Sequence, residues 1–349
     1  VLQRGSVDVR PAASLPSPSA PVAFRHVVIS WGQSPHPLLV RPLRTIDGTV
    51  CFRSNVGSFR TLVADHVVQS RVVFPGAGYL EMARAASAVS ATLPQTQRME
   101  STFFLQPLFV DTPALVAECT IGSSGRFDVR SGITGPGTSL TDATEHCTST
   151  LGRGGTHRVE SVHVATSHVR ARGAYHAADV SALYDFYHDL GLQYGPEYRP
   201  LQQAWFSNGV AAVARLQAKP TRDFMHPSVL DGALQLSALS ADRSQRNETR
   251  LPFAIDQAAL GPCAPNASLW AMVMQQSVEA VMVSMNEPGC DACALLDGFR
   301  SRALRASTAP QTRWLYEVEW SRTQRVSELL DPADPSAMGL LVIGRLTSS

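Results

Sequence analysis

The chain has 349 residues, of which 44% are hydrophobic and 17% are charged, and its formal net charge at pH 7 is +1. This composition excludes a disordered or collagen-like chain, and a charge near zero argues against a nucleic-acid partner. No run approaches the roughly 18 to 20 apolar residues of a membrane span, and the first residues lack the order of a secretory signal. We therefore expect a soluble cytoplasmic protein with no membrane partner, built from several small domains or one duplicated domain.

The first half of the chain passes from a linker pattern to strands and one helix. Residues 1–35 are rich in Pro, Ser and Ala, which is typical of a linker. After them, Pro75 opens an apolar segment that predicts a long buried helix, and a Gly- and Arg-rich stretch at 152–173 is expected to connect two halves. Short runs rich in Val and Phe predict strands around this helix, at 49–55, 59–68, 70–76, 114–122 and 126–132.

The second half repeats this order. A helix is expected to end at Gly191, a hairpin turn is expected at Asn208-Gly209, and Pro227 opens a second apolar helix followed by more strands. Such helices are buried, so an antiparallel sheet curled around each of them would give two similar units. After residue 306 the strand patterns point to the start of a further domain.

The cysteines do not indicate a disulfide framework. The six are scattered, and only Cys290 and Cys293 form a C-x-x-C, which has no second Cys or His pair at zinc spacing. We expect incidental or buried thiols, with metal or redox chemistry at this pair as the alternative.

Three polar constellations stand out. His66 follows a carboxylate before the first long helix, a tight Gly-Pro turn lies in 191–198, and Asp231 lies early in the second apolar helix with Gln235 one turn later. His66 alone is compatible with a structural histidine. The apolar neighbours of Asp231, however, would desolvate its carboxyl, raise its pKa and keep it protonated. A neutral histidine opposite a protonated carboxyl is an acid/base pair.

These motifs resemble the dehydratase domain of type I polyketide synthases. The chain carries the leading H-P-L-L from His36 and an L-P-F from Leu251. Between them, H-x-x-x-G-x-x-x-x-P falls on 66–75, G-Y-x-Y-G-P-x-F on 191–198 and H-P-x-x-L-D-x-x-x-Q/H on 226–235. The motifs occur in the family's order across residues 36 to 305, which makes the resemblance specific.

The resemblance implies an α+β double hotdog, in which two antiparallel sheets each wrap around a central helix. The first hotdog would cover about 36–160 and the second about 173–305. Residues 1–35 would be the linker after an acyltransferase, and 306–349, with its LYEVEW, the start of a structural ketoreductase region.

The implied enzyme is a hydro-lyase that converts a β-hydroxyacyl thioester on an acyl carrier protein into an α,β-unsaturated thioester. His66 would be the general base and Asp231 the general acid, oriented by Gln235 and Tyr194. Backbone N–H groups of Gly76 and Ala77, at a helix N-terminus, are our candidates for stabilising the thioester oxygen. The remaining motif residues carried over are Pro75, Gly195, Pro196, His226 and Pro227.

The resemblance also implies partners and cofactors. The carrier protein and neighbouring synthase domains would be partners, and a homodimer is expected. No metal or cofactor is expected, since the phosphopantetheine arrives with the substrate.

Three residues depart from the family pattern. Ser70 replaces a Gly, which disfavours positive φ and would add a hydroxyl near the base, Leu192 replaces an aromatic, and Tyr198 replaces a Phe. Two alternatives therefore stay open: a relative on the same fold that shifts a double bond, cyclises or folds a poly-β-keto chain, and a catalytically silent structural domain.

Overall fold

A computed structural model gives the fold, and the described residues are 36–44, 49–89, 98–134, 140–152, 175–207, 210–219, 221, 224–240, 248–261, 268–288, 290 and 292–304. The chain divides into two units after Ala303, and all the described helices and strands belong to the first. The linker expected at 1–35, the turn at Asn208-Gly209 and the domain start expected at 306–349 lie outside the described residues. The connection expected at 152–173 does so too, apart from its first residue.

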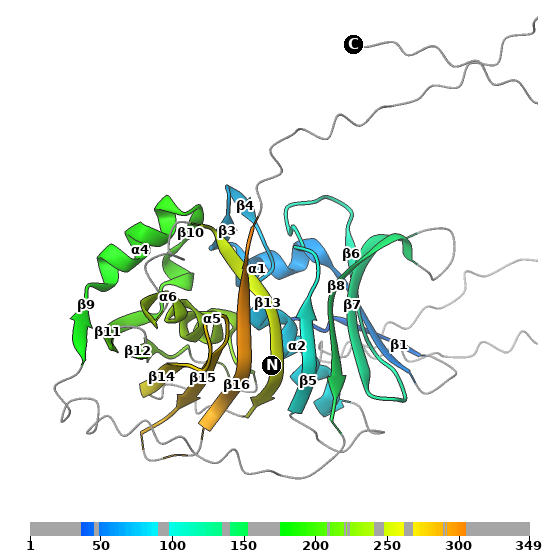
Figure 1. The fold of residues 1–349 in the computed structure, drawn as a ribbon. Helices are drawn as coiled ribbons and strands as arrows, with labels where there is room; N and C mark the ends of the chain where they lie inside the picture. Colours follow the sequence, from blue (N-terminus) through cyan, green and yellow to red (C-terminus); the bar gives the residue numbers. More distant parts are fainter. Residues whose placement is uncertain are drawn as a thin grey trace, which may run out of the picture. The chain divides into compact units, whose positions relative to one another are not determined.

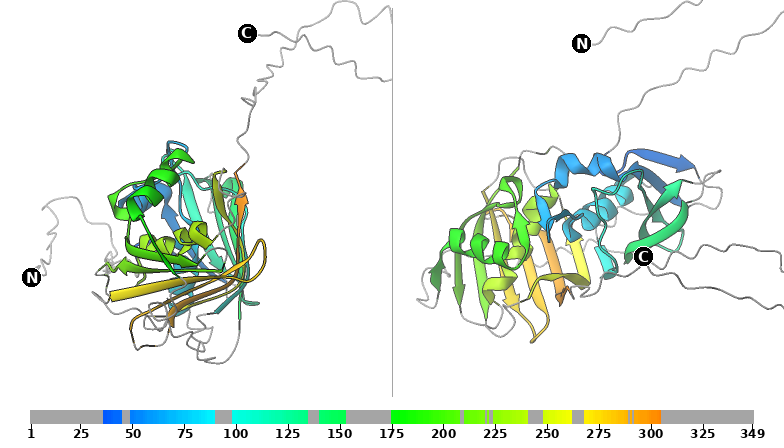
Figure 2. Two further views of the ribbon diagram at one scale, coloured as in Figure 1. Left: turned by 60° about the vertical axis from the view of Figure 1, so that its left-hand side comes forward. Right: turned by 90° about the horizontal axis from the view of Figure 1, so that it is seen from above.

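In the first half, six antiparallel strands curve around one helix (Figures 1 and 2). The helix α2 (Gly76–Val89) directly follows Pro75, as expected. Small side chains at Ala77, Ala83 and Ala86 are fully buried, which lets the sheet approach the helix closely. In spatial order the strands are β1 (Arg41–Arg44), β2 (Val50–Asn55), β6 (Val116–Ile121), β7 (Arg126–Thr134), β8 (Leu140–Leu151) and β5 (Arg98–Phe104).

In the second half, seven antiparallel strands wrap around α5 (Pro227–Gln235) and the short α6 (Ser237–Ser240). Every residue of α5 is buried, so its polar side chains must find partners inside the protein. α4 (Val180–Asp189) precedes the turn at Gly191. The strands in spatial order are β13 (Arg250–Leu260), β16 (Ala292–Ala303), β15 (Val281–Asn286), β14 (Ser268–Gln275), β12 (Ala211–Gln217), β11 (Leu201–Ser207) and β9 (His176–Ala178).

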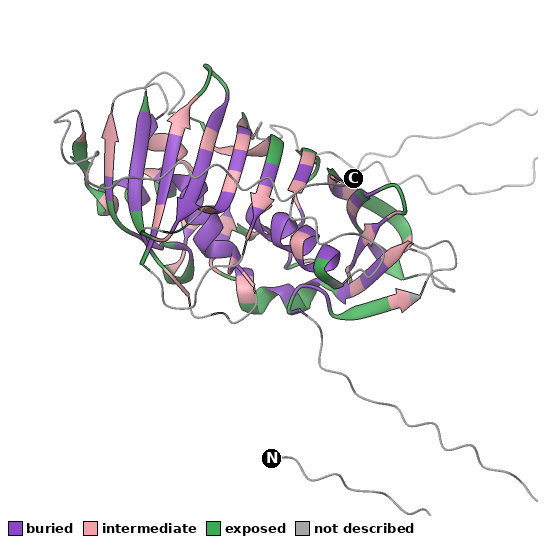
Figure 3. Cartoon of the chain, turned by 90° about the horizontal axis from the view of Figure 1, so that it is seen from below, coloured by how far each residue is buried: buried purple, intermediate pink, exposed green. Residues whose placement is uncertain are grey.

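The two halves join along one pair of strands. β5 pairs with β13 in antiparallel register, which makes one continuous sheet of 13 strands in the described residues. α2 and α5 contact each other on its concave side, and both are largely buried (Figure 3). The architecture is the expected α+β double hotdog, with a helix in each half.

A separate three-stranded sheet ties the halves together near the helices. It contains β10 (Leu192–Tyr194), β3 (His66–Val68) and β4 (Arg71–Val72), so a strand of the second half pairs with a strand of the first. The turn η2 (Pro196–Tyr198) follows β10 after Gly195, which is its N-cap.

Two expectations about local structure were wrong. The run 59–68 is not one strand, because the turn η1 (Val56–Phe59) and the helix α1 (Arg60–Val63) precede β3. The Asn55 side chain accepts a hydrogen bond from the Gly57 N–H and caps this turn, so it favours helical backbone there. The second Pro-led helix is also shorter than expected, since it ends at Gln235 and restarts as α6.

Candidate active site

His66 begins β3 and its ring is fixed by the neighbouring strand. Its Nδ1 lies 2.7 Å from the Val73 carbonyl oxygen, which can only accept a hydrogen bond. Nδ1 therefore carries a proton, so in the neutral ring the free lone pair lies on Nε2. The Val73 N–H donates to the His66 carbonyl at 3.1 Å, so the two residues are held by a reciprocal pair of bonds. The imidazole is thus prepared to accept a proton at Nε2.

The hairpin after His66 contains the first departure from the family pattern. Gln69 and Ser70 have φ of 48° and 65°, so Ser70 does adopt the left-handed region that a Gly would favour. The second half holds this turn, because the Gln69 N–H donates to the Gly191 carbonyl at 2.7 Å and the Ser70 N–H to Gln193 Oε1 at 2.8 Å. Ser70 is exposed at the hairpin tip and does not line the pocket, so the expected hydroxyl near the base was wrong.

Asp231 faces His66 from the other half of the protein. It lies on α5 and is 4% exposed, and its Oδ1 is 3.9 Å from His66 Nε2. The helix begins where the sequence predicts, with His226 as N-cap and Pro227 in the first turn. His226 Nδ1 accepts a hydrogen bond from the Ser228 N–H at 3.2 Å, and burial, helped by Lys219, lowers the pKa of His226 to about 4. His226 is therefore a neutral cap.

The carboxyl of Asp231 is held in a desolvated environment. Burial raises its pKa above the usual range, and the nearby His66 ring and the Gln235 amide oppose this rise. The net direction is upward, so the carboxyl keeps its proton to higher pH than an exposed aspartate does. A carboxyl with a raised pKa and the Nε2 atom of His66 thus face each other.

Gln235 contacts the acid directly. Its Nε2 donates to Asp231 Oδ2 at 2.9 Å and to the Tyr198 carbonyl at 3.1 Å, so both amide hydrogens have partners. Two tyrosines of α4 complete the arrangement: the Tyr184 hydroxyl donates to Gln235 Oε1 at 3.1 Å, and the Tyr187 hydroxyl donates to the Gln235 carbonyl. Neither tyrosine is predicted from the sequence as a site residue. Their only signal was a spacing of three on a helix, which is equally typical of a buried face.

The Gly-Pro turn of β10 and η2 is bound to the residue before His66. The Gly195 N–H donates to the Asp65 carbonyl, and the Glu197 N–H to Asp65 Oδ2, both at 2.8 Å. A side chain on Gly195 would overlap the Asp65 carboxylate, which explains a glycine at this close approach. The turn therefore fixes the position of the strand that carries His66.

Two tyrosine rings flank the imidazole. Tyr194 is the direct cross-strand partner of His66, and the centroids of the two rings are 5.7 Å apart. Because directly opposed residues share a face of the sheet, both side chains point to the same side. The Tyr198 ring lies 5.2 Å from the His66 ring and is fully buried. The orienting role expected for Tyr194 stays a prediction.

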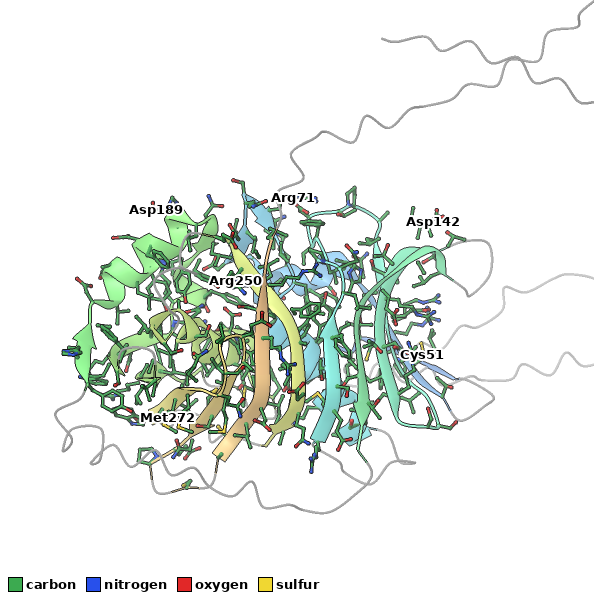
Figure 4. All side chains as sticks on the ribbon, viewed as in Figure 1. Cys51, Arg71, Asp142, Asp189, Arg250 and Met272 are labelled. Carbon is green, nitrogen blue, oxygen red and sulfur yellow. The ribbon has the colours of Figure 1, made fainter. Side chains whose placement is uncertain are left out.

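A pocket of about 120 Å³ connects this pair with the second half of the sheet. His66, Asp231, Gln235, Tyr194 and Leu192 all line it, so four of the predicted site residues and one departure from the family pattern meet there. Two residues labelled in Figure 4 mark this region. Arg250 lines the pocket at the start of β13, and Asp189 ends α4 next to Leu190, which also lines the pocket. Leu234, Leu251, Val281 and Phe299 add apolar walls.

Gly76 and Ala77 lie in the first turn of α2, as expected, but they do not line this pocket. The nearest neighbour that a Cβ on Gly76 would meet is the ring of Pro252, itself a pocket residue, at 3.1 Å. Their proposed role at the thioester oxygen stays a prediction.

Metal-ligating clusters and membrane-spanning helices are both absent from the described residues. No group of three or more His, Cys, Asp or Glu there could hold a metal ion. Cys290 is exposed and Cys293 is buried. No described helix is long and apolar enough to cross a membrane.

Comparison with protein families gives two matches. A model described as a polyketide synthase dehydratase domain matches residues 36–131, and one described as a polyketide synthase dehydratase N-terminal domain matches residues 163–308. The chain belongs to the polyketide synthase dehydratase family. Because the two models lie on the two halves, the dehydratase domain includes both His66 and Asp231.

Known polyketide synthases resemble this dehydratase domain in sequence. The polyketide synthase ThaG of Burkholderia thailandensis is 30% identical over 301 residues, which is 81% of this chain. The polyketide synthase PksN of Bacillus subtilis is 25% identical over 270 residues, or 69% of this chain. The alignment covers 5% of the length of each of these synthases.

Solved dehydratase domains share the fold. The dehydratase domain from the CurF module of the curacin polyketide synthase superposes with a TM-score of 0.65 at 21% identity, covering 77% of this chain and 99% of that one. The dehydratase domain from the terminal module of the rifamycin polyketide synthase gives 0.61 at 22% identity, covering 77% and 96%. These likenesses support the double hotdog.

Proposed function

We propose that this dehydratase domain removes water from a β-hydroxyacyl thioester carried on an acyl carrier protein and releases the α,β-unsaturated thioester. One observation carries the proposal: Nε2 of His66 and Oδ1 of Asp231 face each other at 3.9 Å in one pocket. In the neutral imidazole the free lone pair lies on Nε2, and burial raises the pKa of the carboxyl, so it keeps its proton to higher pH than an exposed aspartate does. Elimination of water needs one proton acceptor and one proton donor, and this pair supplies both.

The reaction follows from these two groups. His66 Nε2 takes the α-proton, the electron pair of that C–H bond forms the α,β double bond, and the β C–O bond breaks. Asp231 gives its proton to the departing hydroxyl, which leaves as water. The imidazolium and the carboxylate that remain are 3.9 Å apart, a gap that one water molecule can bridge, so a proton relayed from His66 to Asp231 restores the starting state.

Related structures support the roles of these residue types. The CurK dehydratase, which superposes on this chain with TM-scores of 0.63 to 0.64, has been solved as an inactive Asp-to-Asn mutant and as an inactive His-to-Phe mutant. A histidine and an aspartate are thus needed in that enzyme.

A direct assay tests the proposal. A β-hydroxyacyl thioester of a carrier protein, or of a short pantetheine mimic, is incubated with the domain, and a mass loss of about 18 Da is followed by mass spectrometry. We expect loss of water with the wild type and a decrease of about 10² to 10⁴-fold for His66→Ala and for Asp231→Asn. A wild type without this loss would contradict the proposal and favour the silent domain. A rearranged product of unchanged mass would favour the isomerising or cyclising alternative.

A further inference from the structure

Tyr184 lies behind the candidate site, where its ring packs edge-on against that of Tyr194 at 6.4 Å and its hydroxyl is hydrogen-bonded to Gln235. Its hydroxyl is buried on α4, accepts a hydrogen bond from the Leu201 N–H at 3.3 Å and donates to Gln235 Oε1 at 3.1 Å. Burial raises the pKa of Tyr184 further above its usual range, so the hydroxyl stays a donor at all working pH values. Tyr184 does not line the pocket.

The partners of Gln235 permit one orientation of its amide. Nε2 faces two acceptors, Asp231 Oδ2 and the Tyr198 carbonyl, while Oε1 faces the hydroxyl hydrogen of Tyr184. The Tyr194 side chain is also hydrogen-bonded to the Gln235 side chain. Turning the amide around would place Oε1 against the Tyr198 carbonyl oxygen and Asp231 Oδ2, and would leave the buried Tyr184 O–H without its acceptor. The Tyr184 hydroxyl therefore locks Oε1, while the Tyr198 carbonyl holds the NH₂ group, in the orientation that donates to Asp231.

This lock determines which carboxyl oxygen of Asp231 carries the proton. Oδ2 accepts from Gln235, so the proton of the neutral carboxyl resides on Oδ1, and Oδ1 is the oxygen that faces His66. We propose that Tyr184 is a positioning residue, which fixes the Gln235 amide so that the acidic proton of Asp231 points toward the reacting hydroxyl. The inference rests on the proposed function, because it assigns Asp231 as the acid.

The test compares two tyrosine-to-phenylalanine variants. Tyr184→Phe removes the lock, whereas Tyr79→Phe is a matched control in the first half, where the buried hydroxyl has no hydrogen-bond partner among the described residues. For Tyr184→Phe we expect kcat to fall about 10-fold with KM unchanged, as for one lost buried hydrogen bond. Weaker donation from Gln235 raises the pKa of Asp231, so the alkaline limb of the kcat–pH profile should move to higher pH. Tyr79→Phe should leave both unchanged.

A double-mutant cycle separates positioning from general structural damage. If Tyr184 acts through Gln235, Tyr184→Phe should lower kcat in the wild type but not in a Gln235→Leu background. An equal loss in both backgrounds, or a loss with an unmoved pH profile, would overturn the inference. The inference would also be overturned if the Tyr184→Phe variant had the same kcat and the same pH profile as the wild type.

An infrared titration separates this inference from the proposed function. The carboxyl band of Asp231, isolated by subtracting the spectrum of Asp231→Asn, reports its pKa without turnover. If the wild type removes no water but Tyr184→Phe raises this pKa, the lock exists and the proposed function fails. If the wild type is active and Tyr184→Phe leaves the pKa unmoved, the lock fails and the function stands.

Discussion

Gly232 of α5 lies directly against the ring of Pro200, so closely that a Cβ on Gly232 would overlap the proline ring. Pro200 precedes β11, and Gly232 follows the candidate acid Asp231 in the chain. This contact sets how near α5 comes to the turn that carries Tyr198. The position of the acid in the pocket therefore depends on the absence of a side chain at Gly232.

Gly232→Ala should displace α5 and destabilise the fold. Overpacking of this kind costs about 1 to 3 kcal/mol, and kcat should fall because Asp231 moves with its helix. Denaturant unfolding and steady-state kinetics measure the two effects. Gly122→Ala is the control, since the nearest atom that its Cβ would meet is 3.8 Å away, and it should change stability by less than about 0.5 kcal/mol. Equal effects at both positions would contradict the packing argument.

Asp231→Asn should stabilise the folded protein at high pH while removing activity. Because burial raises the folded pKa of Asp231, the wild type loses stability as pH rises from about 3.8 through that folded pKa. Asparagine does not ionise, so the variant escapes this loss and should unfold at higher temperature than the wild type near pH 8. The difference should shrink toward pH 4. Thermal unfolding across this pH range checks the sign. A wild type whose unfolding temperature rises relative to that of the variant as the pH increases would contradict the prediction.

Ser70→Gly should stabilise the hairpin without changing the chemistry. Ser70 has a φ of 65° and lies exposed outside the pocket, so glycine relieves a strained backbone at about 1 kcal/mol. Chemical unfolding should show this gain while kcat and KM stay at wild-type values. Ser124→Gly, at an exposed turn residue without positive φ, should give no gain. A changed kcat in Ser70→Gly would place Ser70 in the site after all.

Leu192→Tyr should restrict the acyl chain that the pocket accepts. Leu192 lines the pocket and is 5% exposed, so a larger ring must occupy pocket volume. We expect kcat/KM to fall with increasing acyl length, about 10-fold or more for long chains, and to change little for the shortest substrate. A series of β-hydroxyacyl thioesters of increasing length measures this. Leu105→Tyr, at a residue 43% exposed, is the control and should behave as the wild type.

The fold could be predicted from the sequence to the level of two strand-wrapped helices. Pro75 and Pro227 mark both helix starts, and the motif order places His66 and Asp231 on different halves. The short helix α1 was not predicted. The run rich in Val and Phe favours a strand, and only the capping residue Asn55 favours helical backbone there.

The candidate site was only partly predictable. His66, Asp231 and Gln235 come together as expected, since each lies in a recognisable motif. Tyr184 and Tyr187 were missed because their roles depend on how α4 packs against α5, a tertiary contact that no local spacing encodes. The exclusion of Ser70 from the pocket likewise follows from where the hairpin ends in space.

The pairing of β3 with β10 has a consequence for the integrity of the site. The strand that holds the candidate base belongs to one half, and the strand that supports it belongs to the other, as does the candidate acid. Neither half can supply a competent proton-transfer pair on its own. Two halves produced as separate polypeptides should therefore be inert individually and regain turnover on mixing, so that catalytic output reports the reassembly of the duplicated domain.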